Sequence, residues 1–128
     1  MSYAARTGQI MKSDETVINE ADIIEAKISG WIEKASGDNA VITATKAAVV
    51  SKSHYISAIL AGYTKEATGL LTIKDGTTIK AEYPVYNSDI IVLPVPIKCT
   101  AGNAVSVTLT ASGASGNIGK LNLVGFTF

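Results

Sequence analysis

The chain has little of what catalytic, disulfide-bonded or nucleic-acid-binding proteins use. Its 128 residues include one cysteine, Cys99, and one histidine, His54, and only 17% of them are charged. A lone cysteine excludes an internal disulfide framework. Arginine occurs once, at Arg6, and the formal net charge is zero. Because nucleic-acid binding relies on arginine forks and clustered positive charge, we expect no nucleic-acid partner.

Membrane features are also missing from the sequence. No apolar run approaches the roughly 20 residues that a membrane-spanning helix needs. No basic stripe suits a membrane surface, and the first residues, MSYAARTGQIMKSDE, lack the apolar core of a signal peptide. We therefore expect no membrane association and no secretory leader.

The residues that could carry catalysis stand alone. A catalytic histidine needs a nucleophile and an orienting carboxylate, and Ser51 and Ser53 lie too close to His54 along one strand start to form such a set. Cys99, without a second cysteine, is typical of a small buried hydrophobe. No acidic, histidine or cysteine residues show metal-ligand spacing, and the stretch GASGNIG lies between expected strands rather than ahead of a helix. We expect no enzyme, no cofactor and no metal.

What the chain has in quantity is apolar and β-branched residues. The hydrophobic fraction is 47%, and with so few charges this predicts a protein that buries much of its surface against a partner. From Ala40 onward, short runs rich in Val, Ile, Thr and Tyr alternate with turn-rich stretches, which predicts an all-β sandwich or barrel. The length allows one domain with a substantial core.

Three segments predict particular strands. The run Ala104 to Ala111 alternates strictly between apolar and polar residues, which indicates one face in the core and one in water. The run His54 to Tyr63 is apolar on both sides and predicts a central strand. Pro94 and Pro96 cannot donate ladder hydrogen bonds, so their segment is an edge strand or an extended connection.

The stretch LLTIKDGTTIKAEY predicts a hairpin, and its turn decides which residues face inward. A two-residue Asp75–Gly76 loop would set apolar residues opposite polar ones. A three-residue loop, residues 74–76 with Gly76 in the left-handed conformation, pairs Leu71 with Ile79 and is preferred. The core expected from these patterns consists of Ile56, Leu60, Leu71, Ile73, Ile79, Val105, Val107 and Leu109.

Residues 1–35 are expected to form an N-terminal arm, and residues 36–128 the sandwich domain. Apolar residues from Val17 to Trp31 recur at steps of four and three, which is typical of an amphipathic helix beginning near Asp14. The β-branched pairs in the same stretch, and Gly30, favour one or two strands instead, and both alternatives stay open for residues 15–33. The segment AKISGWIEKASGDNAVITAT fits a strand, a turn around residues 36–39 and a second strand.

Residues 40–128 carry a resemblance to a known class of proteins. The stretches KSHYISAILAGY and GLLTIKDGTTI, followed by IIVLPVPIKCTAGNAVSVTLTASGASGNIGKLNLVGF, resemble small tailed-bacteriophage virion proteins with a jelly-roll β-sandwich. The resemblance implies an antiparallel jelly-roll-like sandwich of about eight strands. It also implies a capsid decoration or cement protein, a homotrimer that binds the major capsid protein or other virion proteins. Such a protein is made in the host cytoplasm and located on the capsid surface.

Two groups of residues are candidates for contact with partners. In the terminal stretch GKLNLVGFTF, Leu121 and Leu123 share one side and are expected in the core of a strand inside a sheet. Val124, Phe126 and Phe128 share the other side, and they are expected to mediate self-association unless a loop or the arm of the same chain covers them. The second group, Trp31, Tyr83 and Tyr86, could form an aromatic contact surface. That surface would suit the alternative function, a glycan- or receptor-binding module of a tail or fibre, although separated aromatics are more often core residues.

Overall fold

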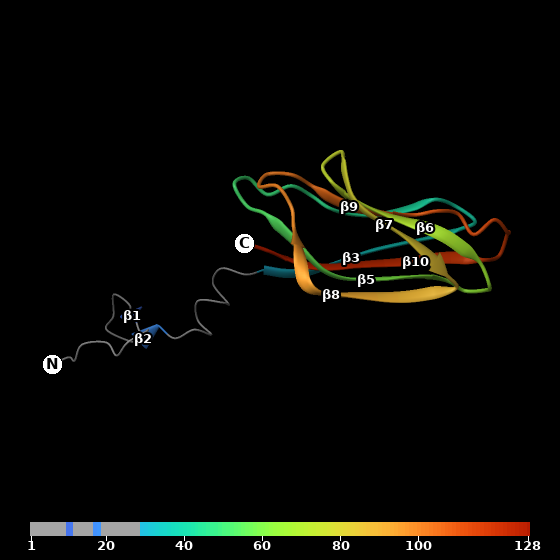
Figure 1. The fold of residues 1–128 in the computed structure, drawn as a ribbon, viewed down its shortest axis with the longest axis horizontal. Coiled ribbons are helices and arrows are strands. Elements are labelled where there is room, and N and C mark those ends of the chain that lie inside the picture. The colour runs from blue at the N-terminus through green and yellow to red at the C-terminus, as the bar shows by residue number, and fades with distance from the viewer. Residues whose placement is uncertain (1–9, 12–16, 19–28) are drawn as a thin grey trace.

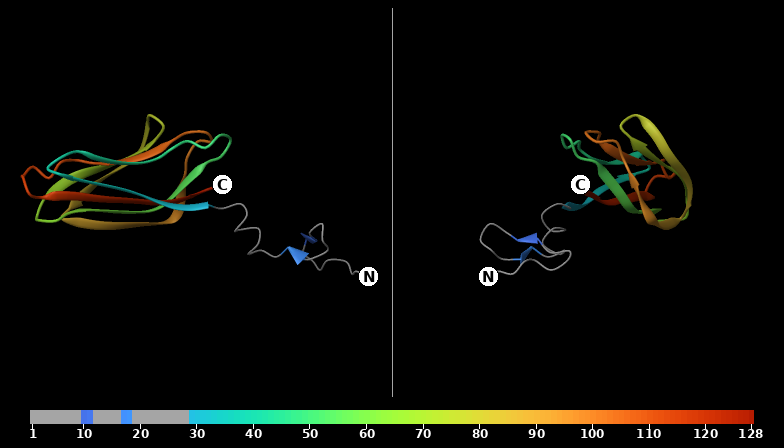
Figure 2. Two further views of the ribbon diagram at one scale, coloured as in Figure 1. Left: turned by 180° about the vertical axis from the view of Figure 1, so that it is seen from behind. Right: turned by 60° about the vertical axis from the view of Figure 1, so that its left-hand side comes forward.

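The computed structural model describes residues 10–11, 17–18 and 29–128. Strands β1 (Ile10–Met11) and β2 (Val17–Ile18) pair antiparallel with each other. The remaining strands form a sandwich of two antiparallel sheets, which appear as two layers in Figures 1 and 2. They are β3 (Ser29–Asp38), β4 (Ile42–Lys46), β5 (His54–Tyr63), β6 (Thr68–Asp75), β7 (Thr78–Tyr86), β8 (Ser88–Lys98), β9 (Val105–Leu109) and β10 (Ile118–Thr127).

The strand order is that of a jelly roll. One four-stranded sheet has the order β3-β10-β5-β8 and the other has β4-β9-β6-β7. Among consecutive strands of the sandwich, only β6 and β7 pair as a hairpin; every other connection crosses from one sheet to the other. The predicted all-β, jelly-roll-like sandwich of eight strands is thus confirmed for the described residues, which contain no helix.

The core lies between the two sheets and is made by the inward side of each strand. In β9 and in β10 buried residues alternate with partly exposed ones, as the sequence pattern predicted. Fifteen apolar residues are buried there: Ile42, Ala44, Ile56, Ile59, Ala61, Tyr63, Leu71, Ile73, Val85, Cys99, Val105, Val107, Leu109, Leu121 and Leu123. Removal of this apolar surface from water is the main force that holds the sheets together.

Two of the expected core residues face outward. Leu60 is 37% exposed because its neighbours Ile59 and Ala61 take the inward direction, and side chains alternate along a strand. Ile79 is 51% exposed. It lies beside a β-bulge in β7, where Lys80 is the extra residue between the pairs Lys74–Ile79 and Ile73–Ala81. The prediction was wrong for these two residues and is confirmed for the other six.

The β6–β7 turn differs from both loops considered from the sequence. Asp75 pairs with Thr78, so the loop consists of Gly76 and Thr77. Gly76 has a positive φ, as predicted, with a value of 60°. Thr77 has a negative φ, and this combination is typical of a type II′ turn. The preferred three-residue loop was wrong because Asp75 faces the interior, where contacts described below hold it.

Strand β5 lies inside its sheet, between β10 and β8, and β8 is an edge strand, as predicted. The expected strand, turn and strand near residues 36–39 is confirmed as β3 and β4, joined through Asn39 at a φ of 47°. The two strands join different sheets. Strand β3 crosses the boundary predicted after residue 35, so the sheet includes residues 29–35. Residues 17–18 and 29–33 are strand rather than helix, and the rest of the proposed helix lies outside the described residues.

Candidate functional site

The two outer faces of the sandwich differ in chemistry. On sheet β4-β9-β6-β7, the outward positions of the first three strands are largely hydroxyl residues, and the apolar Leu70 and Tyr86 are exposed towards the β7 edge. Thr43, Thr108 and Thr72 lie side by side across these strands, and the hydroxyls of Thr43 and Thr108 are 3.2 Å apart. Side chains of this kind keep their hydrogen bonds with water. We call this side the hydroxyl face.

The outer face of sheet β3-β10-β5-β8 is apolar, and we call it the apolar face. A row of Ile32, Val124, Ala58 and Val92 crosses all four strands. Ile32 is 61% exposed and Val92 is 69% exposed. The next row contains Leu60 and Ile90, and Ile90 is 71% exposed. Contiguous exposed apolar surface on a soluble protein marks a contact with another molecule.

Aromatic residues occupy one end of the apolar face. Phe126 of β10 stacks on Tyr55 of β5, with ring centroids 4.9 Å apart and planes at 7°. The Lys98 ammonium lies 6.0 Å from the Tyr55 ring centroid. Phe128 follows at the end of the chain and is 52% exposed. Val124 and Phe126 lie on the outer side of β10, as the sequence predicted, and Phe128 is exposed just beyond the strand.

The placement of β10 confirms the other half of that prediction. The strand pairs with β3 on one side and β5 on the other, and Leu121 and Leu123 are buried in the core. A central strand needs no charge or proline to protect an edge. Self-association through its outer side stays a prediction.

The opposite end of the apolar face is hollowed on both sides of β10. A hollow of about 330 Å³ lies over β10, β5 and β8, and its lining includes Leu60, Ile90 and Lys120 together with the carboxylate Asp89. A second, of about 380 Å³, lies towards β3 and includes Lys34 with the same Lys120 and Asn122. Lys120 therefore stands between two shallow depressions.

Lysines outnumber carboxylates on the apolar face, where Asp89 is the carboxylate that lines the hollow. Lys34, Lys98 and Lys120 lie at outward positions of the sheet, and Asp38 lies at its rim, where its Oδ1 accepts a hydrogen bond from the Gly116 amide (2.7 Å). The ion pairs found within residues 29–128 involve Lys46 and Lys80 instead. Within those residues, the three lysines of the apolar face have no carboxylate at ion-pair distance.

The predicted aromatic contact surface is not assembled in the structure. Trp31 is half-buried, packs edge-on against His54 and donates from Nε1 to the Thr127 hydroxyl (2.9 Å). Tyr83 packs against the core, whereas Tyr86 is 64% exposed on the other side of β7. The three rings do not share one exposed surface.

His54 is fully buried and both of its ring nitrogens are engaged. Nε2 lies 2.7 Å from the Ala47 carbonyl and must donate to it, because a carbonyl only accepts. In the neutral ring, Nδ1 then accepts from the Thr127 hydroxyl at 2.7 Å. Thr127 thus links Trp31 to His54, a network that the sequence did not indicate because its members are far apart along the chain. Its place in the core supports the structural role expected for His54.

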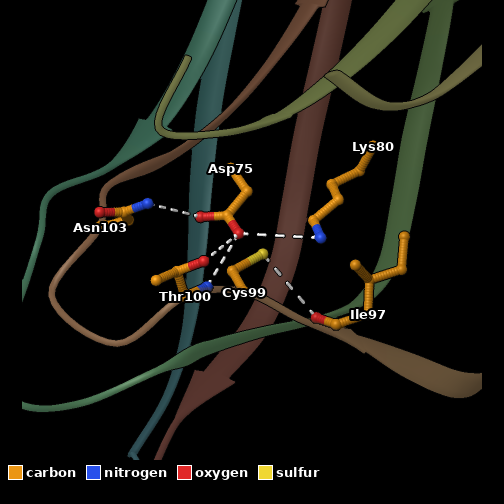
Figure 3. Close-up of polar contacts among 6 residues, drawn as sticks. All are labelled: Asp75, Lys80, Ile97, Cys99, Thr100 and Asn103. Atoms are coloured by element: carbon orange, nitrogen blue, oxygen red, sulfur yellow. Dashed lines mark hydrogen bonds and ion pairs between the residues drawn. The ribbon is translucent and has the colours of Figure 1, made fainter. Parts of the chain in front are cut away.

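A second polar cluster joins the β6–β7 turn to the loop after β8 (Figure 3). Asp75 is 3% exposed; its Oδ2 accepts hydrogen bonds from the Thr100 amide (2.9 Å) and hydroxyl (2.8 Å). Its Oδ1 accepts from Asn103 Nδ2 at 3.1 Å, and the Lys80 ammonium is 4.0 Å away. Burial raises the pKa of Asp75, but these hydrogen bonds and Lys80 outweigh burial and hold that pKa below its ordinary value of 3.8.

Cys99 lies beside this cluster and is buried. Burial, and then the nearby Asp75 charge, raise the pKa of its thiol to about 11. The thiol therefore stays protonated near neutral pH and is a poor nucleophile. This agrees with the packing role expected from the sequence.

Within the described residues, no three His, Cys, Asp or Glu side chains are grouped so that they could hold a metal ion. No helix there is long and apolar enough to cross a membrane. Comparisons of the chain with protein-family models, curated proteins and solved structures found no match.

Proposed function

We propose that this protein is a structural component of a tailed-bacteriophage particle, a decoration or cement protein that binds the major capsid protein at the capsid surface. The sequence resemblance supplies the class of protein. The observation that carries the proposal is the apolar face of the jelly roll, where Ile32, Ile90 and Val92 are largely exposed side by side. A protein that acts by covering and joining its neighbours needs such a surface.

The mechanism is stabilisation by burial. Each contact removes apolar surface from water, which contributes roughly 25 cal/mol per Å². A symmetric oligomer then multiplies a weak single contact through avidity. In the proposed homotrimer, Val124, Phe126 and Phe128 face the same residues of two sister chains. The outward positions of Val124 and Phe126 on β10, and the exposure of Phe128 just after that strand, support this arrangement.

The polar interior fits a structural role. In the described residues, every buried side-chain nitrogen or oxygen has a hydrogen-bond partner. The hydrogen bonds of the Asp75 and His54 clusters join loops and strands of the fold to each other. The glycan-binding alternative gains no such support, because Trp31 and Tyr83 pack against the core.

The test combines an oligomer measurement with capsid binding. The variant Ile90→Ser/Val92→Ser changes two exposed residues of the apolar face, and Leu70→Ser/Tyr86→Ser, on the opposite sheet, is the matched control. Light scattering and co-sedimentation with expanded, undecorated capsids should show loss of assembly or binding for the first variant only. The proposal would be overturned if the wild-type chain does not co-sediment with capsids and binds to a glycan array instead.

A further inference from the structure

The chain's net charge of zero hides an uneven distribution. Residues 13–26, SDETVINEADIIEA, hold five carboxylates and neither lysine nor arginine. Residues 29–128 hold eight lysines against six carboxylates, an excess of two positive charges. We call residues 13–26 the acidic segment. It is opposite in sign to the sandwich, and above all to the apolar face with its three lysines.

The acidic segment also matches the apolar face in hydrophobicity. Its carboxylates alternate with two β-branched pairs, Val17–Ile18 and Ile23–Ile24. The hollowed end of the apolar face has the complementary pattern, since Leu60 and Ile90 line the depression, and Lys120 and Lys34 beside β10 outnumber the one carboxylate of its lining, Asp89. An extended segment could place its apolar side chains in the hollow while its carboxylates pair with the lysines. Both the apolar and the charged groups would then be buried against complementary partners.

We propose that the acidic segment of one copy binds the hollowed end of the apolar face of a second copy. Its carboxylates meet Lys34 and Lys120, and its isoleucines enter the hollow beside β10. The inference rests on the self-association in the proposed function and names the segment that joins one subunit to the next. It leaves the aromatic end of the face, around Phe126 and Phe128, for the sister-chain contact.

The position of the segment favours a second copy over its own sheet. Strand β3 begins at Ser29, which pairs with Thr127, whereas Lys120 lies seven residues further along β10, about 23 Å away at ~3.3 Å per residue. To cover its own hollow, the chain would have to double back over the sheet ahead of Ser29, whereas a neighbouring copy can be reached without such a reversal. Continued outward, the 14 residues of the segment can span up to about 46 Å, enough to reach a neighbour.

A charge exchange tests both the contact and its direction. The face variant carries Lys34→Glu/Lys120→Glu, and the segment variant carries Glu20→Lys/Asp22→Lys/Glu25→Lys. Each variant alone places like charges opposite each other at the contact. Given the strength of exposed ion pairs, we expect the association constant from sedimentation velocity to fall by about tenfold. Mixing the two variants restores opposite charges between chains, and association should return towards the wild-type value.

Controls separate this contact from general charge effects. The variant Lys52→Glu/Lys74→Glu changes the net charge by the same amount as the face variant, at positions away from the apolar face. It should associate as the wild type does. A synthetic peptide of residues 13–26 should compete with wild-type association, and more weakly at 1 M salt, where the screening length is only about 3 Å. Circular dichroism on each variant confirms that it is folded.

Three results would overturn the inference: a wild-type chain that stays monomeric, folded variants that associate normally, or a mixture that associates no better than its components. A chain that carries the face and the segment substitutions together is a further control. If that chain associates as the wild type does but the mixture of the two variants does not, the segment binds its own sheet. Capsid co-sedimentation is scored separately. Wild-type binding to capsids with no rescue in the mixture refutes this inference alone, whereas rescue without capsid binding refutes the virion function alone.

Discussion

Removal of the Asp75 carboxylate should destabilise the fold in a pH-dependent way. Three hydrogen bonds from Thr100 and Asn103 end on this carboxylate, whose side chain is 3% exposed. Bonds to a charged acceptor contribute about 1.5–3 kcal/mol each, offset by the cost of burying the charge. Asp75→Ala leaves the Thr100 amide and the Asn103 amide nitrogen without their acceptor, and we expect a loss of about 2–5 kcal/mol in the free energy of unfolding at pH 7.

The pH dependence follows from the lowered pKa. Because the folded-state pKa of Asp75 lies below its ordinary value of 3.8, the stability it contributes is fully present above that value and is lost as pH falls through the folded-state pKa. Urea unfolding of the wild type and of Asp75→Asn at pH 7, 5 and 3 measures this. The difference between the two proteins should be largest at pH 7 and 5 and should shrink at pH 3.

Comparison with the asparagine variant cancels the contribution of other carboxylates that titrate in the same range. Asp89→Asn, a substitution at an exposed position of β8, is the matched control and should differ little from the wild type at any pH. Parallel pH profiles for the wild type and Asp75→Asn would refute the argument that the carboxylate is held in its charged form.

Three further predictions concern the core. Leu109 is fully buried between Ile42 and Leu71 on neighbouring strands, so Leu109→Ala should lower the free energy of unfolding by about 2–5 kcal/mol. An unchanged denaturation midpoint would contradict the packing of β9. Thr127→Val keeps the shape but removes the hydroxyl that serves His54, and should cost about 1–3 kcal/mol by thermal or urea unfolding, while Thr127→Ser should stay near the wild type. Cys99, whose thiol pKa is raised to about 11, should react with a thiol-specific reagent at pH 8 only in denaturant, and rapid labelling of the folded chain would contradict its burial.

The candidate surface could be predicted in part. Alternation along GKLNLVGFTF separated Leu121 and Leu123 from Val124, Phe126 and Phe128, because successive side chains on a strand point to opposite faces. The lysine-flanked hollow could not be predicted, since Lys34, Leu60, Ile90 and Lys120 come from four strands. Their order across the sheet depends on pairings between residues up to 98 positions apart, as for Ser29 and Thr127, which no local pattern encodes.

By itself, the sequence determined the local preferences of this protein. β-branched runs with period-two alternation specified the strands, Gly76 specified a positive-φ turn, and the prolines of β8 kept that strand at an edge. Only the tertiary structure decided how these strands combine. Asp75 could fix the β6–β7 turn once Thr100 and Asn103 had been brought to it, and Trp31 became a partner of His54 once β3 had paired with β10. The physical reason is that a buried polar group takes whichever partner the packed chain presents, and that partner can be distant in sequence.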